Sequence, residues 1–162
     1  MYLTKNSKKY YADALNEVEK FDDIYWGLDL HSKPFIEEIN KNLMIQTIYS
    51  TFAKRSNGMD LQSYLTISFS HEVELLIYRA ILPDIIYYFN NKGNQYSTCH
   101  YSYNKPTIYK HLIGKDVELK CRDDANYFNI HNIRISLNGG NLELHQEFWQ
   151  NLSNSFKKLS KI

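Results

Sequence analysis

A segment near the end of the chain has the alternating pattern of a half-buried β-strand. From Ile130 to Leu137, the alternation puts Ile133, Ile135 and Leu137 on one face and Asn132, Arg134 and Ser136 on the other. The next residues, Asn138-Gly139-Gly140-Asn141, have the composition of a tight turn, and Leu142-Glu143-Leu144-His145 resumes the alternation. This pattern predicts a β-hairpin, and therefore an antiparallel sheet in this part of the chain.

The spacing of apolar residues then changes to that of a helix. Residues three or four apart predict a C-terminal helix with one apolar stripe, made of Phe148, Leu152, Phe156 and Leu159. Lys157 and Lys158 lie near its end, where positive charge suits the helix dipole. Weaker alternation predicts two more strands before the hairpin, from Tyr96 to Tyr103 and from Val117 to Arg122.

The first half of the chain has helix-like spacing and predicts three helices. The first runs from Ser7 to Lys20. The second begins at Ser32-Lys33-Pro34 and ends at Asn57-Gly58, with a core side of Phe35, Ile36, Ile39, Leu43, Ile48 and Phe52. The third spans about Ser70 to Asn91, with a stripe of Val73, Leu76, Ile77, Ala80 and Ile81, and Pro83 should break or kink it. The expected fold is α+β: a helical N-terminal half, an antiparallel sheet in the C-terminal half and a C-terminal helix.

Length and composition favour one domain, residues 1–162, in the cytoplasm. The 162 residues are about the size of a single domain. No apolar run approaches the ~20 residues that span a bilayer, and the first residues lack the apolar core of a signal peptide. The two cysteines, Cys99 and Cys121, do not form a disulfide framework. The 14 tyrosines are the strongest compositional bias, and tyrosine suits protein interfaces.

Motifs for catalysis or metal binding are weak, so we expect no catalytic residue, no metal and no cofactor. Cys99, His100, His111 and Cys121 are residue types that bind zinc, but their spacing matches no standard zinc signature. The run His71-Glu72-Val73-Glu74 begins like a zinc-protease helix, yet Leu75 stands where the second histidine belongs.

Two other functions stay open at this point. A metal-dependent nuclease would use Glu118 and Lys120, which share one face of a predicted strand, with Asp84 or Asp116 as a further acid. A nucleic-acid-binding regulator would use aromatic and basic residues that interleave along one stretch, namely Tyr96, Tyr101, Tyr103, Lys105, Tyr109 and Lys110.

Two segments resemble immunity proteins of bacterial contact-dependent growth inhibition systems. They run from Lys9-Tyr10-Tyr11-Ala12-Asp13-Ala14-Leu15 through Tyr25-Trp26-Gly27-Leu28, and from Ser63-Tyr64-Leu65 through Arg79-Ala80-Ile81, about a third of the chain. The resemblance implies a non-enzymatic inhibitor that binds a cognate toxin domain, a metal-dependent DNase, in a one-to-one complex. It also implies that a toxin strand or hairpin extends the inhibitor's sheet.

The strand pattern, rather than the resemblance, suggests the residues that would bind such a toxin. Tyr101 and Tyr103 fall on one face of the strand, and His100 and Ser102 fall on the other. We expect the partner-binding residues to be Tyr96, His100, Tyr101, Tyr103, Tyr109, Lys120 and Arg122. For any single tyrosine, a place in the core with a bonded hydroxyl is the alternative.

Overall fold

The computed structural model describes residues 2–5, 8–9, 31–55, 60–92, 97–104 and 131–159. The elements in chain order are α2 (Lys33–Asn40), β1 (Ile45–Lys54), β2 (Gln62–Phe69), a long helix of four segments, β3 (Thr98–Asn104), β4 (Asn132–Asn138) and α6 (Leu142–Leu159). The segments of the long helix are η2 (His71–Val73), α3 (Glu74–Leu76), η3 (Ile77–Ile81) and α4 (Leu82–Asn90).

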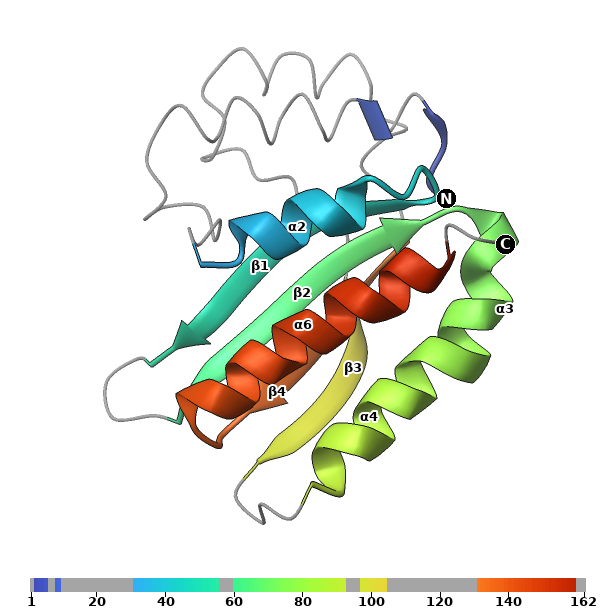
Figure 1. The fold of residues 1–162 in the computed structure, drawn as a ribbon. Coiled ribbons are helices and arrows are strands. Elements are labelled where there is room, and N and C mark those ends of the chain that lie inside the picture. Colours follow the sequence, from blue (N-terminus) through green and yellow to red (C-terminus); the bar gives the residue numbers. More distant parts are fainter. Residues whose placement is uncertain are drawn as a thin grey trace.

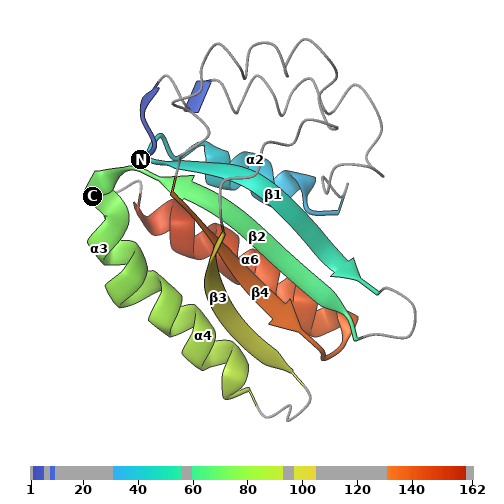
Figure 2. The same ribbon diagram turned by 180° about the vertical axis from the view of Figure 1, so that it is seen from behind.

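The described strands form one antiparallel sheet with the order β1-β2-β4-β3. Helices α2, α6 and α4 lie on the same face of this sheet, with α2 over β1, α6 across the middle and α4 beside β3 (Figure 1). Seen from behind, the strands lie in front of α2 and α6, and α4 lies beside β3 (Figure 2). The described part of the protein is therefore a sheet layer with a helix layer on one face.

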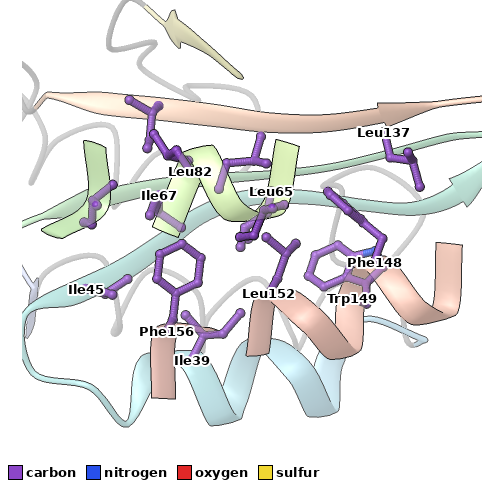
Figure 3. Close-up of a cluster of buried hydrophobic side chains, with 14 of the residues drawn as sticks. Ile39, Ile45, Leu65, Ile67, Leu82, Leu137, Phe148, Trp149, Leu152 and Phe156 are labelled. Carbon is purple, nitrogen blue, oxygen red and sulfur yellow. The ribbon is translucent and has the colours of Figure 1, made fainter. Parts of the chain in front are cut away.

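The core fills the space between the sheet and the helices. Figure 3 shows Phe148, Trp149, Leu152 and Phe156 of α6 lying toward apolar side chains of the strands. Ile135 and Leu65 pair across β4 and β2, and both are fully buried. Burial of apolar side chains contributes roughly 1.5–3 kcal/mol each, so this layer is the main source of stability.

The opposite face of the sheet is polar. On β2 and β4, Thr66 pairs with Arg134 and Tyr64 pairs with Ser136. The Arg134 guanidinium lies over the Tyr64 ring, 4.1 Å from its centroid, and its Nε donates a hydrogen bond to the Thr66 hydroxyl at 3.1 Å. The predicted alternation of residues 130–137 is confirmed, because Ile133, Ile135 and Leu137 face the helices.

The prediction of one helix from residue 32 to residue 58 is wrong. Helix α2 ends at Asn40, and the chain turns at Asn42, whose side-chain Oδ1 accepts the Met44 N–H at 2.9 Å. Ile48 and Phe52 then belong to β1, and Leu43 is exposed. Together with the unpredicted β2, this strand shows that the N-terminal half is not mainly helical, whereas the α+β class and the antiparallel sheet are confirmed.

The predicted second strand of the hairpin is also wrong. Residues 142–145 form the first turn of α6, and β4 pairs with β2 and β3 instead. Asn141 begins the helix, since its Oδ1 accepts the Leu144 N–H at 2.9 Å. The turn signal itself is real, because Gly139 and Gly140 both have positive φ, at 83° and 81°. The predicted C-terminal helix is confirmed and longer than expected.

The third predicted helix exists, but Pro83 widens it rather than ending it. Segment η3 is a π-helical turn, in which the Leu82 N–H bonds the Ile77 carbonyl five residues back. Pro83 has no N–H to bond the carbonyl of Arg79, four residues back, and its ring would clash with that carbonyl in a regular α-helix. The wider π-helical turn avoids this clash. Ala80 is exposed, contrary to the predicted stripe, while Ile77 is fully buried.

Two predicted elements, the helix Ser7 to Lys20 and the strand Val117 to Arg122, lie outside the described residues, apart from Lys8 and Lys9. Within the described ranges, no helix is both long and apolar enough to cross a membrane.

Candidate partner-binding site

Strand β3 is at the edge of the described sheet, with β4 on its inner side. The side chain of Asn90, at the end of α4, bonds the outward backbone groups of Cys99. Its Oδ1 accepts the Cys99 N–H at 2.7 Å, and its Nδ2 donates to the Cys99 carbonyl at 2.9 Å. Because outward and inward groups alternate along an antiparallel strand, the backbone N–H and C=O of Tyr101 and Tyr103 also face outward. No other described strand lies beyond them.

The side chains of β3 have the alternation expected from the sequence. Tyr101 and Tyr103 pair with the core residues Ile135 and Ile133, so they share the helix-facing side of the sheet. Unlike those partners they are exposed, Tyr101 at 40% and Tyr103 at 70%. His100 and Ser102 lie on the opposite, polar side and are also exposed. For Tyr101 and Tyr103, exposure therefore argues against the alternative of a place in the core.

Tyr78, in the π-helical turn, joins these two residues into a cluster. Its ring centroid lies 6.2 Å from that of Tyr101 and 6.0 Å from that of Tyr103. Beneath, Phe69 meets the Tyr78 ring edge-on at 5.9 Å. Burial raises the pKa of Tyr78, and a hydrogen bond with Tyr103 raises it further, so the phenol stays neutral at physiological pH. Aromatic rings anchored in this way are pre-organised for contact.

Tyr2 extends the cluster toward a carboxylate. Its hydroxyl donates to Glu74 Oε2 at 2.6 Å, and its ring lies 4.9 Å from His71 and 5.3 Å from His131. The pKa of Tyr2 is raised mainly by the hydrogen bond to Glu74, with a smaller effect of Tyr103. We call Tyr2, Tyr78, Tyr101 and Tyr103 the tyrosine cluster.

The structure describes only part of the predicted partner-binding set. His100, Tyr101 and Tyr103 lie on β3 as expected, whereas four members lie outside the described residues: Tyr96, Tyr109, Lys120 and Arg122. The same holds for most residues of the two alternative functions, namely Lys105, Lys110, Asp116 and Glu118. Asp84 is described, and it is exposed in the first turn of α4.

The possible zinc ligands on β3 point away from one another. Cys99 is buried in the core, while His100, the next residue, is exposed on the other face. His111 and Cys121 lie outside the described residues, and among those described no group of three or more metal-binding side chains occurs. Burial raises the pKa of the Cys99 thiol to about 12, so it is not a reactive nucleophile.

A serine and a histidine meet inside the protein, but their contact is structural. Ser63 Oγ lies 2.6 Å from His145 Nδ1, and His145 Nε2 lies 2.7 Å from the Gly139 carbonyl. A carbonyl only accepts, so Nε2 carries the proton and the Ser63 hydroxyl donates to Nδ1. The Ser63 oxygen also accepts the Ala53 N–H at 2.8 Å. Both side chains are completely buried, so no substrate can reach the serine oxygen.

Sequence reasoning did not select Tyr2, Glu74 or Tyr78 as site residues. They come from separate segments. The packing of the long helix beside β3 places Tyr78 against Tyr103, and the bond from the Leu3 N–H to the Phe69 carbonyl holds Tyr2 near Glu74. In the sequence, Tyr78 stands between Ile77 and Arg79 like any helical residue, and the tyrosine bias was the one available signal.

No family model, characterised protein or solved structure matches this chain. We therefore infer its function from its own residues and contacts.

Proposed function

We propose that the protein is a non-enzymatic inhibitor, an immunity protein that binds and neutralises a cognate toxin domain through the edge of β3. The toxin contributes an extended strand that pairs with the outward backbone groups of Tyr101 and Tyr103. The toxin is a nuclease domain, and the complex is one-to-one.

The observation that carries this proposal is that β3, at the edge of the described sheet, exposes two tyrosine side chains on one face. Charged side chains and prolines are the usual protection of an exposed edge, and β3, with the sequence Thr-Cys-His-Tyr-Ser-Tyr-Asn, has neither. Strand addition supplies affinity through backbone hydrogen bonds, and side chains at alternate positions supply selectivity. Tyrosine is common among the residues that dominate binding energy at interfaces.

The direct test is co-purification of the tagged protein with the C-terminal domain of the protein encoded immediately upstream. We expect a stable one-to-one complex and loss of that domain's toxicity in cells. Absence of a complex, or an upstream gene unrelated to any toxin, would reject the proposed function.

A proline substitution distinguishes strand addition from other contacts at the same surface. Tyr103→Ala and Tyr103→Pro both remove the ring, but only the proline removes the outward N–H. An edge position whose N–H has no ladder partner tolerates proline. We expect Tyr103→Ala to weaken toxin binding roughly thirtyfold, as for an interface hot spot that contributes about 2 kcal/mol. Tyr103→Pro should weaken it clearly more.

Tyr87 provides the matched control. It lies on α4 and is 71% exposed, almost the same as Tyr103. Tyr87→Ala should bind the toxin domain with unchanged affinity, and thermal unfolding of each variant checks that the fold is intact. Equal binding by the alanine and proline variants at position 103 would exclude strand addition there.

A further inference from the structure

Glu74 is a partly buried carboxylate for which the described residues provide no cation. Its side chain accepts a hydrogen bond from the Tyr2 hydroxyl, and within the described residues no lysine, arginine or histidine lies in ion-pair distance of it. Two other carboxylates of the helix layer differ in this respect: Glu38 pairs with Lys41, and Glu147 pairs with Lys92.

The rings beside Glu74 add a second attraction for positive charge. An aromatic ring has a negative face, and a cation within about 6 Å of its centroid is attracted to it. Tyr103 packs one side against Tyr78 and leaves most of its surface open. Burial and hydrogen bonding keep the phenols of Tyr78 and Tyr2 protonated, so the cluster presents neutral rings around one carboxylate.

We propose that the tyrosine cluster and Glu74 bind a cationic side chain, an arginine or lysine carried by the protein strand that adds to β3. This inference rests on the proposed function, because the cation arrives with the added strand. In a paired strand, the residue opposite Tyr103 has its side chain on the same face, with the two Cβ atoms about 4.5–5.5 Å apart. A long basic side chain from that position lies over the rings and reaches toward Glu74.

The test uses the isolated full chain and a matched pair of probes, N-acetyl-argininamide and its uncharged analogue N-acetyl-citrullinamide. Ring signals of Tyr78, Tyr101 and Tyr103 are followed by NMR as each probe is added. We expect saturable shifts with the arginine probe and clearly weaker binding of the citrulline probe. The ring of Tyr87 should not respond. Equal affinity for the two probes, or an equal response at Tyr87, would overturn the proposal.

Two variants test the residues themselves. Glu74→Gln keeps an acceptor for the Tyr2 hydroxyl but removes the charge, and Tyr103→Leu keeps an apolar side chain but removes the ring. Each should lower the affinity for the arginine probe about two- to fivefold, as for a single cation–π or exposed charge contact. Thermal unfolding identifies a variant that fails to fold. In that case, the affinity of the other variant for the arginine probe tests the proposal. Unchanged affinity in a folded variant would overturn the proposal.

The two proposals fail in different ways. If the arginine probe binds as expected but no toxin domain co-purifies, the proposed function is rejected. Binding of a cationic side chain by the tyrosine cluster and Glu74 is then still supported. If a toxin domain binds along β3 with the same affinity in the Glu74→Gln variant, and its basic residues at the contact are dispensable, the proposed function stands and cation recognition is rejected.

Discussion

Replacing Ser63 with alanine tests whether the buried contacts of this residue stabilise the fold. One hydroxyl group serves two partners there. It donates to His145 Nδ1 at 2.6 Å and accepts the Ala53 N–H at 2.8 Å. Ala53 has a positive φ of 46° at an irregularity in the β1–β2 pairing, a conformation that needs support in a non-glycine residue.

The expected loss follows from the two groups left without a partner. An unsatisfied buried polar group costs about 1–3 kcal/mol, and Ala53 is only partly buried, so the sum is about 2–4 kcal/mol. His145 cannot compensate by moving its proton to Nδ1, because Nε2 would then lose its bond to the Gly139 carbonyl. In a chain of this size, the predicted loss lowers the melting temperature by about 5–15 °C.

Urea denaturation followed by circular dichroism measures this loss of unfolding free energy. Ser102→Ala is the control, since it removes an exposed hydroxyl from β3, another strand of the same sheet. Its effect should stay within about 0.5 kcal/mol, as is usual for surface changes. A Ser63→Ala variant that is as stable as the control would refute the assigned proton positions and the importance of this network.

Three further predictions concern other contacts. Burial lowers the pKa of His145, so the unfolded chain takes up a proton before the folded chain does as pH falls below about 6.5. Acid therefore destabilises the fold through this residue, by up to about 1.4 kcal/mol per pH unit. His145→Gln should remove this part of the acid-induced loss of stability. Arg134→Lys should lower the unfolding free energy by about 1–2 kcal/mol, measured in urea, because lysine cannot keep both the stacking on Tyr64 and the Nε hydrogen bond. Asn90→Ala should cost about 1–3 kcal/mol in the same assay, because it removes two hydrogen bonds to Cys99; no loss would contradict that pairing.

The sequence predicts an element correctly where the spacing of its apolar residues fits either a strand or a helix but not both. Ile133, Ile135 and Leu137 alternate with polar residues that line the opposite face, so β4 has a clear period of two. The apolar stripe of α6 repeats every three or four residues from Leu144 to Leu159, which is too long for a strand.

Strand β1 is difficult to predict because polar residues on it are buried. Gln46 and Ser50 are buried beside apolar neighbours, which hides the alternation. The spacing of Ile45, Ile48 and Phe52 fits a helix face equally well, so tertiary packing decides the outcome. At the start of α6, four alternating residues fit either structure, and the Asn141 cap selects the helix.

Only those site residues that lie together on one strand can be predicted from the sequence. Tyr101 and Tyr103 share a face by the period of two alone. Tyr2, Glu74 and Tyr78 enter through contacts between segments far apart in the chain, and the hydrogen bond from Tyr2 to Glu74 spans 72 residues. No local pattern contains such information.

The Asn90 side chain also has a consequence for solubility. A long exposed strand edge is a template on which further copies of the same chain can stack into fibrils. By occupying both outward groups of Cys99, Asn90 shortens the edge that β3 presents, so that it begins at Tyr101. Within the described residues, this leaves the outward groups of two residues, Tyr101 and Tyr103, which are few for stacking of further copies but match the short contact of the proposed strand addition. The same asparagine therefore limits edge-to-edge stacking at Cys99 and leaves the outward groups of Tyr101 and Tyr103 for the strand addition proposed above.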